Sequence, residues 1–296
     1  MRKIILATFL IGVSLSAVAE SKVYTLAPSF HGAEKAEFVS IESENGKTVK
    51  GDFLSSSGQR YSIPDTCEPE GGDPEVSDAY SVQGKENYFV FECAWTVQHS
   101  GIGLDGTQYE TFVYFGKDVT SVVKNKALSQ ALSGYEGSLE EGDRSYAWYS
   151  KRKIASKKLL ELESGKTLDS LALAHEIALI RLKDSDYEAV KSYLSVERIE
   201  LLFKDYPVSK STVVAYNDIG YALGQAGETK LAYQVLKKVE QISPDRIVLK
   251  LNIADVLWVA EKDKSKAYYK EYIGLMKKAG KEALIPKQAI ERSASN

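Results

Sequence analysis

The stretch from Val213 to Pro244 constrains the fold of this 296-residue chain more than any other feature. Small or apolar residues recur in it at steps typical of a helical face: Tyr216, Ile219, Gly220, Leu223, Ala232, Leu236 and Val239. Because an α-helix has about 3.6 residues per turn, the first four residues form one stripe of a helix and the last three form a stripe of a second helix. Gly227 lies between the two stripes and is typical of a helix end. The stretch therefore predicts a pair of helices joined by a short turn.

This pattern resembles the 34-residue tetratricopeptide repeat (TPR), and the resemblance covers every signature position of one repeat. Gly220 and Ala232 occupy the positions at which the family requires small side chains, because two helices touch there. The pattern returns directly after Pro244, as far as Ile273, and, more weakly, in residues 170–204. The resemblance covers about residues 168–292, strongly from 213 to 273. It implies an array of helical hairpins, each of which needs a neighbour to bury its apolar face.

The resemblance also implies a binding site. In TPR arrays the first helix of each hairpin lines a groove that binds another protein or peptide. The groove positions of the family correspond here to six residues: Asn217, Tyr221, Gln225, Asn252, Asp255 and Trp258. Amide side chains can bond an extended peptide backbone, and Tyr and Trp provide rigid contact area. The positions of the basic carboxylate clamp found in some TPR domains hold uncharged residues in this chain: Val214, Asn217, Val248 and Asn252.

Residues 1–19 are typical of a secretory signal peptide. Arg2 and Lys3 precede an apolar run that ends in Ala17-Val18-Ala19, and this run is shorter than the roughly 20 apolar residues that span a bilayer. We expect cleavage after Ala19 and a periplasmic or secreted mature protein with no transmembrane segment.

Charge and composition change near residues 134–142. Residues 20–135 contain 17 acidic and 9 basic side chains, whereas residues 136–296 contain 24 acidic and 27 basic ones. Gly, Pro and Ser are concentrated in the first part, and Ala, Leu, Lys and Glu in the second. We therefore expect an α+β protein of two domains, a β-rich one at 20–135 and an all-α one at 136–296. Neither part is basic enough to indicate nucleic-acid binding.

Cys67 and Cys93 are the two cysteines of the chain. In an exported protein an even pair predicts a disulfide, whose closed loop would stabilise the fold by about 3 kcal/mol. A redox or metal pair is the alternative, but the spacing matches no CxxC motif.

Strand patterns dominate the first domain. Residues 37–42 alternate, residues 88–97 form a long apolar strand, and Asn45-Gly46 is a hairpin turn signal. Two helices are predicted around the domain boundary, one over 119–132 and one over 144–164.

Two clusters suggest metal chemistry at first sight. The segment from Asp65 to Asp78 contains six carboxylates, which favours either a calcium loop or a solvated loop; its spacing does not match the EF-hand pattern. His175-Glu176 begins like the zinc motif HExxH, but position 179 is Leu. We expect no catalytic set, metal or cofactor.

The leading functional hypothesis is an exported, non-enzymatic adaptor that binds another protein through the TPR groove. The alternative is a protein that binds a small ligand or cell-wall glycan in the β-rich domain, with a pocket formed by aromatic residues: Tyr88, Trp95, Tyr109 and Tyr114. An enzyme is the third hypothesis.

Overall fold

The structure is a computed structural model that describes residues 20–43 and 46–295. The predicted signal peptide, its cleavage site after Ala19, and Asn45 of the predicted turn lie outside the described residues. The chain divides into two compact units. The first runs to Ala131 and includes Tyr135–Ser145, and the second comprises Leu132–Gly134 and everything from Tyr146 onward.

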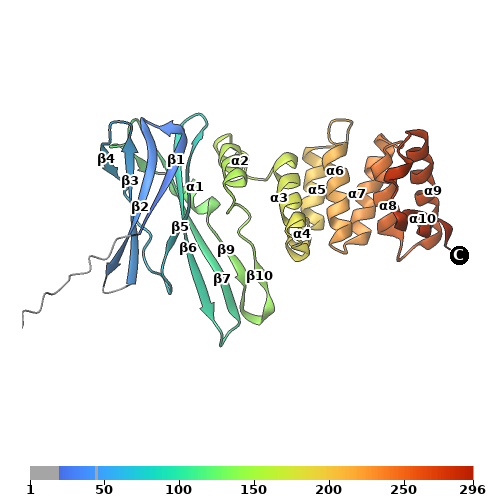
Figure 1. Ribbon diagram of the computed structural model, residues 1–296, viewed down its shortest axis with the longest axis horizontal. Coiled ribbons are helices and arrows are strands. Elements are labelled where there is room, and N and C mark those ends of the chain that lie inside the picture. The colour runs from blue at the N-terminus through green and yellow to red at the C-terminus, as the bar shows by residue number, and fades with distance from the viewer. Residues whose placement is uncertain (1–19, 44–45, 296) are drawn as a thin grey trace, which may run out of the picture. The chain divides into compact units, whose positions relative to one another are not determined.

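The first unit contains two antiparallel sheets (Figure 1). One sheet has the order β1-β2-β3-β4. The other has the order β10-β9-β7-β6-β5, with β8 paired to β7. The strands of the first sheet are β1 (Ser21–Phe30), β2 (Ala33–Ser43), β3 (Gly46–Ser55) and β4 (Arg60–Ser62). Those of the second are β5 (Glu75–Gln83), β6 (Asn87–His99), β7 (Leu104–Phe115), β8 (Val123–Lys124), β9 (Gly134–Ser138) and β10 (Arg144–Ser145).

Aromatic side chains from both sheets form the core of this unit. The rings of Phe53 on β3 and Phe89 on β6 lie 4.6 Å apart between centroids, and Phe91 stacks on Phe112 of β7 at the same distance. Because successive strand residues alternate between faces, one face of β6 supplies the odd-numbered members of this core. The predicted disulfide is confirmed: Cys67 in the loop before β5 is bonded to Cys93 of β6.

The two helices predicted around the boundary are shorter than expected. The first, α1, spans only Lys126–Leu132, because Val123 and Lys124 pair with β7 as β8 and the Asn125 side chain accepts a bond from Leu128 N, 3.1 Å away. The second, α2, spans Arg152–Glu163, because Arg144 and Ser145 pair with β9 as β10. A one-turn 3₁₀ helix at Glu140–Gly142 joins β9 to β10.

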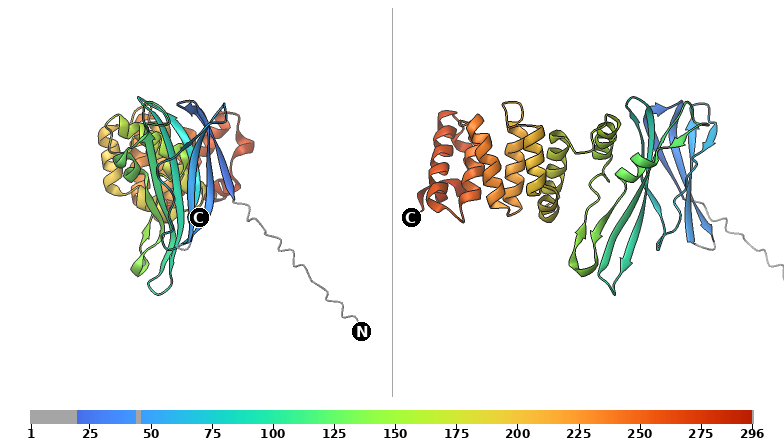
Figure 2. Two further views of the ribbon diagram at one scale, coloured as in Figure 1. Left: turned by 90° about the vertical axis from the view of Figure 1, so that its left-hand side faces the viewer. Right: turned by 180° about the vertical axis from the view of Figure 1, so that it is seen from behind.

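The second unit is an array of helices that follow one another in chain order (Figure 2). After α2 come α3 (Leu171–Lys183), α4 (Tyr187–Tyr193), α5 (Val196–Asp205), α6 (Val213–Gln225), α7 (Thr229–Ile242), α8 (Ile247–Leu257), α9 (Lys262–Lys278) and α10 (Lys287–Ala294). A 3₁₀ turn at Glu282–Leu284 precedes α10. None of the helices in the described part of the chain is long and apolar enough to cross a membrane.

The helix pair predicted from the first sequence stretch is confirmed as α6 and α7. The seven residues of its pattern are all buried. A Cβ atom on Gly220 would lie 2.6 Å from the Leu236 side chain, and one on Gly224 would lie 2.7 Å from Val256 of α8. Glycine is therefore required at both positions by the close approach of neighbouring helices.

The helix expected over residues 187–204 is interrupted. It ends as α4 at Tyr193, and α5 begins at Val196, because the Ser195 side chain caps the new helix by accepting a bond from Arg198 N at 3.3 Å. The break also explains why the sequence pattern there is longer than one helix of the repeat.

Candidate functional site

Five of the six residues predicted to line a groove lie on the neighbouring helices α6 and α8, and the sixth, Trp258, directly follows the end of α8. Tyr221 and Gln225 are exposed. Asn217 and Asn252, in contrast, are only 1% and 5% exposed, and Asp255 and Trp258 are half-buried. The structure therefore separates the predicted set into two exposed residues and four that are engaged with other parts of the chain.

A line of polar side chains connects α3, α6 and α8. His175 Nε2 lies 3.0 Å from Asp218 Oδ2, and Asn217 Nδ2 donates to Asp218 Oδ1 at 3.1 Å. Asn252 Nδ2 donates to Asn217 Oδ1 at 3.3 Å. The amide groups that the sequence predicts to face a partner are thus bonded within the chain: Asn252 donates to Asn217 on the neighbouring helix, and Asn217 donates to Asp218 on its own helix.

Asp255 and Trp258 contact the terminal helix. Arg292 of α10 donates to Asp255 at 3.2 Å and to the Tyr269 hydroxyl at 2.7 Å, and its guanidinium lies 4.8 Å from the Trp258 ring centroid. Burial raises the pKa of Asp255, against the opposing effects of a bond from Tyr269 and the charge of Arg292. Burial together with Asp255 also raises the pKa of Tyr269 to about 12. These two predicted residues therefore hold α10 in place.

Exposed apolar side chains lie on α3, α6 and α8. They are 37% to 49% exposed and comprise Leu179, Val214, Tyr221 and Val248. We call the surface that they form on α3, α6 and α8 the first-helix face. The sequence predicted only Tyr221 among these side chains as a contact residue, although it placed Val214 and Val248 at the clamp positions of the groove. The other three could have been identified by comparing corresponding positions of the repeats. Leu179 lies two residues after Ile177, as Tyr221 lies two residues after Ile219, and Val248 lies one repeat length after Val214. Such a group of solvent-exposed apolar residues is typical of an interaction surface.

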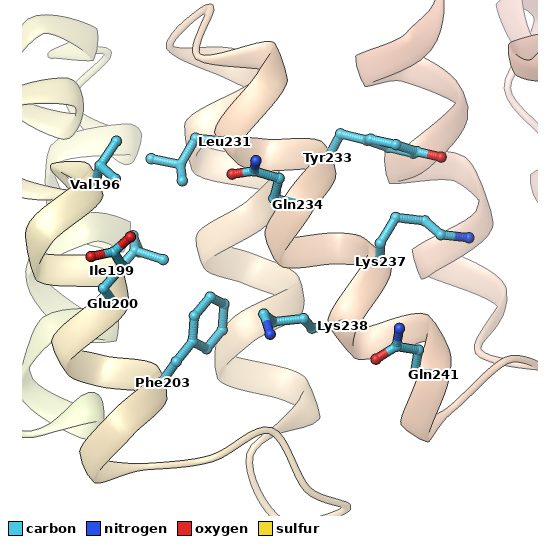
Figure 3. A pocket seen from close by; sticks show the side chains of 10 residues that line it. All are labelled: Val196, Ile199, Glu200, Phe203, Leu231, Tyr233, Gln234, Lys237, Lys238 and Gln241. Atoms are coloured by element: carbon cyan, nitrogen blue, oxygen red, sulfur yellow. The ribbon is translucent and has the colours of Figure 1, made fainter.

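A second surface feature lies between α5 and α7, which we call the second-helix groove (Figure 3). Its volume is about 650 Å³. It is lined by Val196, Ile199, Glu200 and Phe203 of α5 and by Leu231, Tyr233, Gln234, Lys237, Lys238 and Gln241 of α7.

A buried charged cluster surrounds Asp169, just before α3. Lys158 Nζ and the Tyr149 hydroxyl donate to Asp169 Oδ1 at 2.7 and 2.8 Å. Tyr193 and Arg198 donate to Oδ2 at 2.6 and 2.9 Å. Burial disfavours the charged carboxylate, but the bonds from Lys158 and the two tyrosines outweigh it and hold the pKa of Asp169 below its usual value. Both carboxylate oxygens are occupied, so the cluster joins α2, α3, α4 and α5.

In the first unit, the aromatic residues proposed as a ligand pocket belong mainly to the core. Tyr88, Trp95 and Tyr114 are buried, and Tyr109 is half-buried. A cavity of about 410 Å³ does lie beside Trp95, toward the outer end of the β6–β7 hairpin. Its lining includes Val97, Leu104 and Tyr135.

The acidic segment predicted as one loop from Asp65 to Asp78 is a loop only as far as Pro74, because Glu75 and Asp78 pair with β6 as part of β5. Its first two carboxylates bond within the unit. Tyr114 donates to Asp65, and Lys124 Nζ lies 3.6 Å from it. Glu68 accepts bonds from Thr48 and Thr66, which hold its pKa below the usual value. Among the residues that the structure describes, no three His, Cys, Asp or Glu side chains are grouped so as to hold a metal ion.

Comparisons with known proteins give little further information. No family model matches the chain, and no curated protein matches it. A solved structure titled "MamA MSR-1 C2" is similar at 15% identity, with 48% of this chain and 87% of that chain covered. Its TM-score is 0.31, which is too low to support an argument about fold or function.

Proposed function

We propose that this chain is an exported, non-enzymatic adaptor whose helical unit is a TPR-like array that binds a segment of another protein on the first-helix face. One observation carries the proposal: four exposed apolar side chains lie on three adjacent helices, α3, α6 and α8. The line of polar bonds from His175 to Asn252 fixes these helices relative to one another. A rigid surface loses little conformational entropy when a partner binds, which favours affinity.

The chemistry of the face indicates what the partner segment contains. Leu179, Tyr221 and Val248 offer apolar contact, whereas the amides of Asn217 and Asn252 are already bonded to neighbouring helices. Affinity would therefore come from apolar side chains of the partner more than from bonds to its backbone. Apolar and aromatic anchors at the centre of an interface carry most of its binding free energy.

Two observations support the remaining parts of the proposal. A disulfide persists in oxidising compartments, so the bond between Cys67 and Cys93 favours export, as residues 1–19 do. The cluster around Asp169 has four donors on its carboxylate, and a fully occupied buried carboxylate is suited to holding helices together rather than to catalysis.

The experiment is capture of a partner from an envelope extract with the mature chain, followed by affinity measurements on variants. Tyr221→Ala should weaken binding by about 2 kcal/mol, which is roughly thirtyfold, because an exposed aromatic anchor is lost. Leu179→Ala and Val248→Ala should weaken it by smaller amounts. Lys230→Ala, on α7 and outside the face, is the matched control and should bind like the unchanged chain.

Circular dichroism must first show that each variant is folded. A partner whose affinity is the same for all three folded alanine variants would refute binding at the first-helix face. Protein in the envelope fraction that still begins with Met1 would refute cleavage after Ala19.

A second candidate function rests on the cavity beside Trp95. Its lining combines apolar and aromatic side chains with Gln108 and Glu70, a mixture that suits a small ligand or a glycan fragment. Val97→Trp would fill this cavity. If Val97→Trp abolishes binding of a captured ligand and Tyr221→Ala does not, the first unit is the binding unit.

A further inference from the structure

The second-helix groove is formed by one stripe of side chains from each wall. On α5 the stripe is Val196, Ile199 and Phe203, and on α7 it is Leu231, Gln234 and Lys238. Residues at steps of three and four lie on one side of a helix, so each wall presents a single continuous face. Figure 3 shows these side chains pointing toward one another, with Val196 and Leu231 at one end and Phe203 and Lys238 at the other. Val196 is 51% exposed, although it is apolar.

This groove is not a general consequence of helix stacking, because the space on the other side of α7 is filled. There Tyr268 of α9 bonds Lys237 and Glu240, and Lys250 of α8 bonds Glu240 and Glu271. Ser265 of α9 and Ala232 of α7 are corresponding positions, both small and buried. Tyr268 lies three residues after Ser265, whereas the residue three after Ala232 is Val235, whose side chain is shorter than that of tyrosine.

The connections between helices also differ on the two sides of α7. Residues 206–212 join α5 to α6, whereas only residues 243–246 join α7 to α8. The longer connection and the break at Leu194–Ser195 thus occur at the same helix, α5, that forms one wall of the groove.

The walls limit the kind of backbone that the groove can accept. Both are helices, whose backbone groups bond along the helix, so they offer an occupant side chains and no sheet edge. A helix satisfies its own backbone N–H and C=O groups, so a helical occupant would lose no backbone hydrogen bonds when it binds to these apolar side chains. From Val196 to Phe203 and from Leu231 to Gln241 the stripes run about 10 and 15 Å, enough for two to three helical turns.

Charges of opposite sign lie on the two walls. Lys238 Nζ of α7 lies 5.0 Å from the Phe203 ring centroid, and Glu200 belongs to the α5 wall. Lys237 also borders the groove, but it extends to the other side of α7, where it bonds Glu240 and Tyr268 (Figure 3). An occupant that complements the groove therefore has an apolar stripe, a carboxylate on the flank next to α7 and a cation on the flank next to α5.

We propose that the second-helix groove docks an amphipathic helix of a partner protein, with its apolar stripe on Phe203 and Leu231 and a carboxylate at Lys238. This site is separate from the first-helix face, and the two faces together would let the chain join two proteins. Neither proposal depends on the other.

The test uses a fluorescein-labelled synthetic helix and the full mature chain, with fluorescence anisotropy as the readout. The probe has about 15 residues, a hydrocarbon staple to hold it helical, Leu on one stripe, Glu on one flank and Lys on the other. A peptide of the same composition in scrambled order is its control. The designed helix should bind at least about tenfold more tightly than the scrambled peptide.

Two pairs of variants locate the site. Gln234→Trp places a bulky ring in the middle of the groove and should weaken binding at least about tenfold, whereas Lys230→Trp, on the same helix outside the groove, should not. Lys238→Glu should weaken binding about threefold to fivefold, and a probe with Lys on both flanks should restore it. Lys230→Glu makes the same charge change outside the groove and should have no effect. Equal melting temperatures of the paired variants verify that folding is unaffected.

Several results would overturn the proposal. These are no binding of the designed helix up to about 1 mM, equal binding of the scrambled peptide, or binding that Gln234→Trp leaves unchanged. The last experiment measures the oligomeric state of the chain by itself, by sedimentation. A dimer that Gln234→Trp dissociates would identify the occupant as a second copy of this chain and would also refute the proposed partner helix.

Discussion

The two units of this protein are stabilised by different kinds of contact. In the first unit the core joins residues from distant strands, such as Phe53 and Phe89, and a disulfide links Cys67 to Cys93. In the second unit the largest helix contacts join helices that follow each other in the chain, as when Leu236 of α7 lies against Gly220 of α6, although α3 packs most closely on α6. The comparison teaches that a fold made of local contacts leaves a periodic signal in its sequence, whereas one made of distant contacts does not.

The units also differ in how they use charge. The second unit contains buried or half-buried carboxylates, Asp169, Glu240 and Asp255, each bonded to cations and tyrosines from other helices. The first unit also buries one carboxylate, Glu92, which accepts bonds from the hydroxyl groups of Ser77 and Thr111, and it contains stacked rings, of which Phe91 and Phe112 are the closest parallel pair. Removal of Asp169 should therefore affect the second unit, and removal of the disulfide should affect the first.

The largest effect is expected for Asp169→Ala. Removal of one partner from a buried ion pair leaves Lys158 buried and unpaired, which typically costs about 3–5 kcal/mol. Thermal unfolding should show a lower midpoint for the transition of the helical unit, with no change for the sheet unit. The control is Asp245→Ala at an exposed position, which should change stability by less than about 0.5 kcal/mol. Loss of stability in both units would contradict the separation that we describe.

The disulfide should have a similar effect on the other unit. Replacement of Cys67 and Cys93 by Ala should lower the stability of the sheet unit by about 3 kcal/mol, because the unfolded chain regains the freedom of the closed loop. Chemical denaturation followed by near-ultraviolet circular dichroism measures this change. An unchanged midpoint for the sheet unit would show that the bond contributes no stability.

A smaller effect is expected where α6 and α7 touch. Ala232→Leu inserts a larger side chain against Gly224, where a Cβ atom would lie 3.9 Å from the Ala232 methyl group, and should cost about 1–3 kcal/mol. Lys230→Leu, two residues earlier and exposed, should cost little. If the two variants melt at the same temperature, the packing of this helix pair is looser than described.

The smallest effect concerns pH. The folded-state pKa of Asp169 lies below its unfolded value, so the stability that it contributes is present above about pH 4 and is lost as the pH falls through the folded-state pKa. The helical unit of Asp169→Asn should therefore show a shallower loss of stability than the unchanged chain as the pH falls below about 4. Parallel stability curves for the two proteins would contradict this assignment.

Much of the second unit could be predicted from the sequence by itself. Tyr216, Ile219 and Leu223 are buried as their spacing predicted, because a helix brings residues three and four apart to one side whatever its surroundings. Lys250 lies one repeat length after Tyr216 but is charged, and the sequence does not indicate what its ammonium group bonds. In the structure its ammonium bonds Glu240 and Glu271, which come from two other helices.

The sequence also determined the pairing of the two cysteines, since the chain contains no others. Only the tertiary structure decided which predicted site residues remain accessible. Asn217 and Asn252 lie on different helices, and their mutual bond depends on how α6 packs on α8, which spacing along one helix does not encode. The same holds for Trp258, which the terminal helix contacts through Arg292. Helical periodicity is a property of a few consecutive residues, whereas the exposure of a side chain depends on segments that can be distant in the chain.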